Sequence, residues 1–177
     1  MDNVIRQIGN QPFSEDNIME LVEGKTKIIS YSDLSKYSSI EEALDPHGSL
    51  IILYETKENF GHWVSLFVVD DCTLEFFDPY AYAIDDELAM VPEYFREESG
   101  QDYPHLTQLI KNSAKFSRVI YNQEKLQKLK KDVNTCGRWA GIRTQMRAVP
   151  LKVFQKLFLK QKFDPDWYVC ALTGFVR

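Results

Sequence analysis

The sequence predicts an α+β protein in which a small, mostly antiparallel sheet is flanked by helices. Three observations support this class. Residues 1–45 carry short helical patterns joined by turns, the middle of the chain carries apolar runs typical of strands, and the last third carries apolar residues at helical spacing. Helices and strands that are segregated along a chain are typical of α+β folds. We expect a single domain over residues 1–177.

Start and stop signals predict the N-terminal helices. Ser14 is a typical N-cap, and the apolar residues that follow it at helical spacing are Ile18, Leu21 and Val22. A second short helix is expected over residues 40–44. It should end before Pro46, because the residue that precedes a proline disfavours helical backbone.

Four apolar runs in the middle of the chain are expected strands: residues 49–54 (SLIILY), 63–69 (WVSLFVV), 73–77 (TLEFF) and 116–121 (FSRVIY). Asp70 and Asp71 mark a hairpin turn between the second run and the third. Pro79 ends the third run because proline cannot donate to a sheet. Residues 80–102 are interpreted as an acidic, partly helical insertion, and residues 106–111 as a short helix.

The last third of the chain is expected to form three helices. The first covers residues 136–148, where the residues at helical spacing are Trp139, Ile142, Arg143 and Met146. The second begins at Pro150, and the third follows the N-cap Asp164 and its neighbouring proline. We interpret Trp139 as a core residue. Arg138 is expected on the solvated surface unless it pairs with an acid or contacts substrate.

Composition and charge argue against several classes of function. The formal net charge is -5 and the pI is about 5.3, which argues against a broad nucleic-acid surface. The basic stretch from Lys125 to Lys131 is interpreted as a solvated loop. No run approaches the ~20 apolar residues of a membrane span, and the N-terminus lacks a signal-peptide pattern. We expect no membrane association.

Cysteine and histidine usage points to a reduced thiol. The cysteines are Cys72, Cys136 and Cys170, an odd number at wide spacing, and the three histidines form no spaced ligand motif. A metal site, a cofactor and a disulfide framework are therefore not expected. A reducing, intracellular compartment fits this usage better, and a reduced thiol can act as a nucleophile.

Three short segments carry residues suited to thiol chemistry: residues 59–63, entering a strand; residues 76–80, leaving the next strand; and residues 134–139, entering a helix. Cys136 would lie at the start of that helix, where the helix dipole and a protonated histidine favour the thiolate. His62 could serve as its base, and Asp78 could fix the far nitrogen of the imidazole ring.

His62 and Asp78 are sixteen positions apart and flank one predicted hairpin. Neighbouring strands of a hairpin bring such residues to the same open end, although a one-residue slip in register would turn one of them to the other face. Each motif alone has an ordinary structural explanation, as a core cysteine, a structural histidine or a turn aspartate. The order of the three segments is what favours catalysis.

These segments resemble the cysteine protease clan that includes adenovirus maturation proteases, SUMO-specific proteases and proteases of large DNA viruses. Its members share His-Trp on a strand, an acid or Asn on the next strand, a Gln, and Cys-Gly opening the central helix. The matching residues here are His62 with Trp63, Asp78, and Cys136 with Gly137. The resemblance covers roughly residues 48–147 and implies an adenain-like fold. The segment around Cys136 looks most like the viral members.

The resemblance also implies roles for other residues. The family's Gln donates to the oxyanion, and here Gln127, nine positions before Cys136, is the first choice and Gln123 the second. The gap is somewhat shorter in better-known members. Trp63 would shield the catalytic pair, and Gly137 would leave room for a substrate backbone. Both are therefore expected to contact substrate.

The implied function is a thiol endopeptidase that cuts peptide bonds near glycine during maturation of viral capsid or core precursors. Its partner would be such a polyprotein, and its location the virion and the host cytoplasm. An activating peptide remains open as a further partner, whereas nucleic acid is not expected. The alternatives are a deubiquitinase or SUMO-type isopeptidase acting on ubiquitin-like proteins, an acyltransferase, and a catalytically idle binding protein with the same fold.

Overall fold

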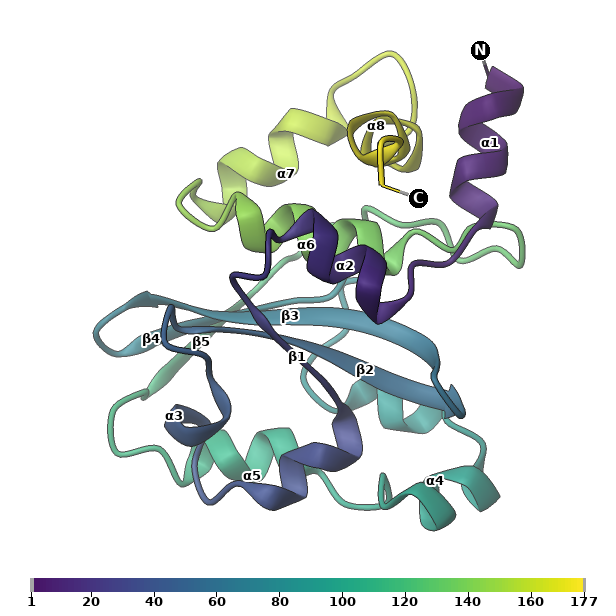
Figure 1. The fold of residues 1–177 in the computed structure, drawn as a ribbon. Coiled ribbons are helices and arrows are strands. Elements are labelled where there is room, and N and C mark those ends of the chain that lie inside the picture. The colour runs from purple at the N-terminus through teal and green to yellow at the C-terminus, as the bar shows by residue number, and fades with distance from the viewer. Residues whose placement is uncertain (1, 177) are drawn as a thin grey trace.

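The protein, described over residues 2–176 by a computed structural model, contains in this range a five-stranded sheet in the order β1-β2-β3-β4-β5 (Figure 1). The strands are β1 (Lys27–Ser30), β2 (Ser49–Lys57), β3 (Phe60–Asp70), β4 (Thr73–Phe77) and β5 (Arg118–Tyr121). The central strands β2, β3 and β4 pair antiparallel, whereas β1 pairs parallel with β2 and β5 pairs parallel with β4. The predicted α+β class is confirmed, with parallel pairing at both edges.

Helices lie on both sides of the sheet (Figure 1). One side carries α1 (Asp2–Asn10), α2 (Glu15–Leu21), α6 (Cys136–Gln145), α7 (Leu151–Leu159) and α8 (Pro165–Thr173). The other carries the 3-10 helices η1 (Tyr31–Lys36) and η2 (Asp86–Met90), with α3 (Ile40–Ala43), α4 (Glu93–Ser99) and α5 (His105–Lys111). Each side has its own apolar core. Among residues 2–176 no helix is long and apolar enough to cross a membrane.

The predicted helix starts are confirmed at two positions. The Ser14 hydroxyl accepts a hydrogen bond from the Asn17 backbone N–H, and the Asn17 side chain accepts from the Ser14 N–H, so α2 begins with a reciprocal capping box. The Asp164 carboxylate accepts from the Trp167 N–H at 3.1 Å and caps α8, with Pro165 in its first turn.

One element lies outside the predictions, and one begins later than expected. β1 falls in the region expected to hold short helices and turns, whereas the short helix α1 agrees with that expectation. β1 has four residues, too few to show a strand period, and its pairing with β2 stabilises it. β5 begins at Arg118, two residues after the predicted start.

α6 lies against the sheet, and a buried ion pair ties it to β4. Arg143 donates from Nε and Nη2 to the two carboxylate oxygens of Glu75, at 2.7 and 2.9 Å. Its Nη1 and Nη2 also donate to the backbone carbonyls of Met146 and Val149. Both charged side chains are buried. The pair therefore fixes the turn after α6 as well as the position of the helix on the sheet.

Arg138 corrects a prediction, because its side chain is buried rather than solvated. Its Nη1 donates to the carbonyl and the hydroxyl of Thr173 on α8, and its Nη2 donates to the carbonyl of Ile8 on α1. The guanidinium also lies over the Phe13 ring. Arg138 is thus a structural link from α6 to both ends of the chain.

Candidate active site

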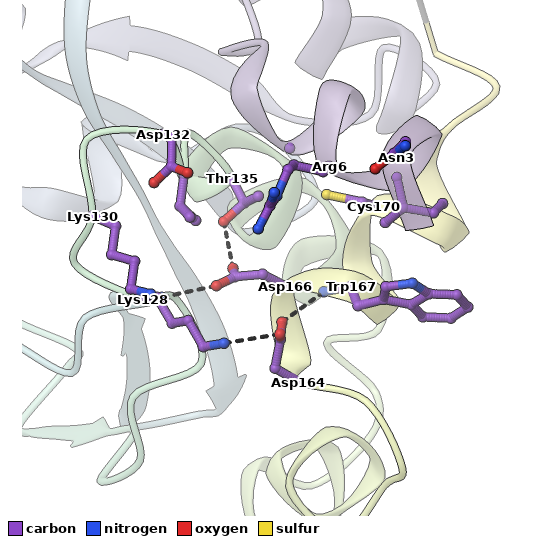
Figure 2. A pocket seen from close by; sticks show the side chains of 13 residues that line it. Asn3, Arg6, Lys128, Lys130, Asp132, Thr135, Asp164, Asp166, Trp167 and Cys170 are labelled. Atoms are coloured by element: carbon purple, nitrogen blue, oxygen red, sulfur yellow. Dashed lines mark hydrogen bonds and ion pairs between the residues drawn. The ribbon is translucent and has the colours of Figure 1, made fainter. Parts of the chain in front are cut away.

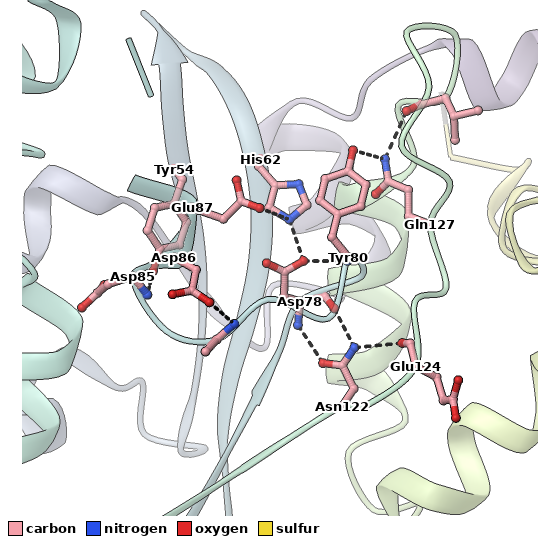
Figure 3. A network of polar contacts seen from close by, with 12 residues as sticks. Tyr54, His62, Asp78, Tyr80, Asp85, Asp86, Glu87, Asn122, Glu124 and Gln127 are labelled. Atoms are coloured by element: carbon pink, nitrogen blue, oxygen red, sulfur yellow. Dashed lines mark hydrogen bonds and ion pairs between the residues drawn. The ribbon is translucent and has the colours of Figure 1, made fainter. Parts of the chain in front are cut away.

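The β3–β4 hairpin brings His62 and Asp78 together. Ser65 pairs with Phe77, so continuing this register by one residue sets Asp78 opposite Val64. His62 lies two residues from Val64 and therefore on the same face as Asp78. The His62 Nε2 atom lies 2.9 Å from Asp78 Oδ1, a hydrogen-bond distance (Figure 3). The register that the sequence left open thus places the two side chains in contact.

The approach of β3 to β2 requires a glycine immediately before His62. A Cβ atom on Gly61 would lie 1.8 Å from the backbone oxygen of Tyr54, the residue of β2 that pairs with His62. No side chain fits there unless the two strands separate. Gly61 therefore helps to fix the position of His62, a role that the sequence motif did not suggest.

Asp78 is held by three hydrogen bonds, each of which joins a backbone group to a side chain. Its N–H donates to Oδ1 of Asn122, and the Asn122 amide donates back to its carbonyl oxygen. The Tyr80 N–H donates to Asp78 Oδ1 at 2.7 Å. Asn122 directly follows β5, so the parallel edge pairing of β4 with β5 supplies this support. The carboxylate is completely buried and its orientation is fixed.

The environment of His62 favours its protonated form. Burial alone would lower the pKa of the imidazole, but the charge of Asp78 and its hydrogen bond outweigh burial. Cys136 lies near enough to act in the same direction, and the pKa of His62 is raised well above its usual value. These surroundings favour the imidazolium form over the neutral ring, which suits pairing with a thiolate.

Cys136 is the first residue of α6, as predicted, and its side chain is 8% exposed. The preceding Thr135 does not cap the helix with its hydroxyl, which instead donates to Asp166 Oδ1 at 2.6 Å. The backbone N–H groups of the first turn of α6 point toward its N-terminus, where Cys136 lies. Their partial positive charge stabilises an anion at this end of the helix.

Asp166 connects the start of α6 to the loop that carries Gln127. It accepts hydrogen bonds from the Thr135 hydroxyl and the Lys128 backbone N–H (Figure 2). The Trp139 indole is a third donor to the same carboxylate. Burial raises its pKa, although these hydrogen bonds oppose that shift. Nothing in the sequence motif pointed to this residue.

The cavity drawn in Figure 2 lies behind this loop. It encloses about 390 Å³ between α1, residues 128–135 and α8. Its charged lining is balanced, with Arg6, Lys128 and Lys130 against Asp132, Asp164 and Asp166. Neither His62 nor Cys136 lines it, so this cavity is not the candidate active site.

Gln127 is buried beside the site, whereas Gln123 lies on the surface. The Gln127 amide donates to the Tyr80 hydroxyl at 3.0 Å and to the Val133 carbonyl at 3.1 Å. The Gln123 amide donates only to the carbonyl of Tyr121, at 3.4 Å, among the described residues. Of the two candidates, Gln127 is the one in contact with the other site residues.

Tyr80 is a site residue that the sequence motif missed. Its ring stacks on His62, with ring centroids 4.5 Å apart and planes inclined by 14°. Burial raises the pKa of its hydroxyl, and the negative charges of Cys136, Glu87 and Asp78 add to the shift. Tyr80 therefore stays neutral and connects His62 to Gln127 (Figure 3). Its only signal in the sequence was its position two residues after Asp78.

Trp63 and Gly137 pack into the core beside Cys136. The Trp63 indole donates to the Phe13 carbonyl, and its side chain is buried. A Cβ atom on Gly137 would lie 2.8 Å from Phe13 and 3.2 Å from Trp63. Phe13, Ile18 and Trp63 occupy the space that a side chain at position 137 would take, so packing is a further reason for a glycine there. Substrate contact by either residue stays a prediction.

His62, Asp78 and Glu87 form a cluster in which one potential ligand atom from each residue lies within 4.8 Å of the others. In a metal site the histidine nitrogen must be free of its proton. Here His62 Nε2 is at hydrogen-bond distance from Asp78, and the ring favours the protonated form. The three side chains thus form a carboxyl–imidazole group that binds the His62 proton.

Comparison with known proteins assigns the fold. The structure is similar to the crystal structure of an ASFV protease, with a TM-score of 0.51, 14% sequence identity, and coverage of 97% of this chain and 70% of that chain. At this identity the likeness shows the fold alone, which is of the adenain-like cysteine protease type. ChlaDub1 from Chlamydia trachomatis has a TM-score of 0.43 and 13% identity, and the match covers 98% of this chain and 74% of that chain.

The sequence comparison assigns the family. No family model matches the chain. The chain is 35% identical over 165 residues to uncharacterized protein V9 of Sputnik virophage, a match that covers 90% of this chain and 93% of that protein. The chain therefore belongs to the same family as this virophage protein.

Proposed function

We propose that this protein is a cysteine peptidase with Cys136 as nucleophile, His62 as general base and acid, and Asp78 as the residue that orients His62. One observation carries the proposal. A buried imidazole is held by Asp78 at 2.9 Å on one nitrogen, and it lies beside a cysteine at the start of a helix. Because Asp78 occupies Nε2, the nitrogen left for the Cys136 thiol is Nδ1.

The proposed reaction uses these groups in turn. The Cys136 thiolate attacks the peptide carbonyl and forms a C–S bond, while the carbonyl electrons move to the oxygen. His62 then gives its proton to the amine nitrogen as the C–N bond breaks. Water attacks the resulting thioester and forms a C–O bond while His62 takes up one proton of that water. The C–S bond then breaks, which releases the carboxylic acid product and regenerates the Cys136 thiolate beside protonated His62. Asp78 keeps the ring oriented throughout.

Gln127 is proposed as the side-chain donor to the oxyanion, together with the Cys136 backbone N–H. Its amide is buried beside Tyr80, which stacks on His62. Both amide hydrogens have acceptors in the resting state, in the Tyr80 hydroxyl and the Val133 carbonyl. The amide must therefore exchange one of these acceptors for the oxyanion when substrate binds.

Gln127→Ala is expected to lower kcat about 10²- to 10³-fold with little change in KM, because the lost interaction forms only in the transition state. Steady-state kinetics on a peptide substrate check this split. Gln123→Ala is the matched control and should leave both constants unchanged, since that side chain lies on the surface. A larger effect of Gln123→Ala would move the donor role to Gln123.

The proposed substrates are viral capsid or core precursors, cut near glycine in the virion or in the infected cell. Membership in a virophage protein family and a fold similar to that of a viral protease support this class. An activating peptide remains a prediction. Digestion of a proteome-derived peptide library, analysed by mass spectrometry, tests the specificity. Cleavage that depends on Cys136 and favours glycine beside the cut supports the proposal.

Labelling with electrophilic probes, compared with the digestion of the peptide library, separates the alternatives. Ubiquitin and SUMO probes that carry a C-terminal electrophile should not label Cys136 if the substrates are viral precursors. Rapid labelling by such a probe, without cleavage of the peptide library, would instead indicate an isopeptidase. The absence of both labelling and cleavage would favour an idle protein with the same fold.

A further inference from the structure

A second acidic side chain reaches the Asp78 side of His62. Glu87 lies on η2, within residues 80–102, for which the sequence predicts only an acidic, partly helical insertion. Its Oε1 atom is 3.7 Å from His62 Nε2, the nitrogen that also bonds Asp78 (Figure 3). The side chain is buried, with 5% of the residue exposed. His62 is therefore faced by two carboxyl groups.

These two carboxyl groups each have an oxygen without a partner. Among the residues 2–176, neither Oδ2 of Asp78 nor Oε1 of Glu87 has a hydrogen-bond partner, and both atoms are buried. Oxygen atoms of the two groups also belong to the cluster within 4.8 Å. Two ionised carboxylates at such a separation repel each other strongly in a buried site. A single proton on the pair removes that repulsion.

The surroundings of Glu87 agree with a bound proton. Burial raises the pKa of Glu87 to about 7, with His62 opposing the shift and Asp78 and Asp86 adding to it. The titratable groups that face Glu87 are His62 on β3, Asp78 and Tyr80 in the segment after β4, and Asp86 on η2 itself. Among them only His62 is cationic, and it is already bonded to Asp78.

We propose that Glu87 is a positioning residue of the catalytic pair, and that it holds a proton beside Asp78 so that the two carboxyl groups together present the single negative charge of Asp78 to His62. This inference rests on the proposed function. It gives the acidic segment a specific role, because η2 places Glu87 beside His62 and so sets the charge that the imidazolium faces. The proton leaves when Glu87 ionises, and the ring then faces two negative charges.

The sign of the effect follows from this arrangement. Ionisation of Glu87 adds a negative charge 3.7 Å from the ring nitrogen, which favours the imidazolium further. In the wild-type protein His62 should therefore hold its proton to a higher pH than in a variant that cannot ionise at position 87. The activity of a thiolate–imidazolium pair would then extend further into the alkaline range.

The test is a pH titration of the histidine ring nitrogens by NMR, with a chelator present to exclude bound metal. In the wild-type protein the His62 signals should show a step near the pKa of Glu87, about 7, besides their own titration. Glu87→Gln should remove this step and lower the pH at which His62 itself titrates by about one unit. Variants His47→Gln and His105→Gln assign the other two rings.

Controls make the result specific. Glu93→Gln removes an exposed acid from α4 in the same segment and should leave the His62 titration unchanged. Should Glu87→Gln not fold, Glu87→Asp replaces it, and the step should persist with a changed midpoint. A step that persists in Glu87→Gln, or an unchanged His62 titration in that variant, overturns the proposal. The titration needs no substrate. The role of Glu87 can therefore be disproved while the peptidase assignment stands, and the peptidase assignment can be disproved while the role of Glu87 stands.

Discussion

Cys136→Ala is expected to lower peptidase turnover at least ~10⁴-fold, because removing the nucleophile leaves only the binding and oxyanion contributions to rate. The fold should be unaffected, since alanine fills most of the volume of a small side chain at the start of α6. Steady-state hydrolysis of a cleaved peptide, with circular dichroism as a check of folding, measures both quantities.

The partner residue provides the control for this prediction. His62→Gln should cost about as much as Cys136→Ala, and the double variant should be no worse than either, because the two residues act as one unit. Cys72→Ala should leave turnover unchanged, since Cys72 is exposed at the β3–β4 turn. Effects of Cys136→Ala and His62→Gln that simply add would contradict a shared catalytic step.

Arg143→Met is expected to lower the free energy of unfolding by roughly 3–5 kcal/mol, because it leaves the buried carboxylate of Glu75 without its partner. Two backbone carbonyls after α6 also lose their donor. Against a total stability of about 5–15 kcal/mol for a protein of this kind, the loss is large. Urea denaturation, followed by tryptophan fluorescence, measures it.

Two further variants separate charge burial from packing. The double variant Glu75→Met with Arg143→Met should recover part of the loss, since no buried charge is then unpaired. Arg118→Met breaks the exposed pair with Asp70 and should cost about 1 kcal/mol or less. A cost of Arg143→Met as small as that of Arg118→Met would mean that the buried pair contributes little to stability.

The arrangement of His62, Asp78 and Cys136 could be predicted because each lies where a strand or helix begins or ends. Such positions are marked in the sequence by turn residues and by changes in apolar periodicity. The order of the three segments along the chain also resembles that of a known clan of cysteine proteases. The sheet register could not be predicted in this way, since the pattern of β3 is apolar on both faces and so tolerates either alternation.

Residues that act through distant segments had no comparable signal. Asp166 reaches the start of α6 from α8, and Glu87 reaches His62 from an insertion. Asn122 fixes Asp78 through the parallel pairing of β5. None of these contacts could be predicted from the sequence, because the chemistry of a side chain does not identify the distant atoms that it contacts in the fold. Buried polar partners of this kind become visible only in three dimensions.

The site also depends on segments outside the region of resemblance. Phe13 precedes α2 and occupies the space beside Gly137, and its carbonyl holds the Trp63 indole. α8 supplies Asp166. The two ends of the chain lie outside residues 48–147, the region of resemblance, and they pack directly around the start of α6 and the loop of Gln127.

The most direct test of the central claim is the alkylation rate of each cysteine by iodoacetamide at pH 6, resolved by mass spectrometry. At this pH an ordinary thiol is less than about 1% ionised. Cys136 should react much faster than the exposed Cys72, and Cys170 should not react, because burial raises its pKa to about 11. His62→Gln should remove the advantage of Cys136. The thiolate–imidazolium pair would be contradicted if Cys136 reacted no faster than Cys72. It would also be contradicted if His62→Gln left the alkylation rate of Cys136 unchanged.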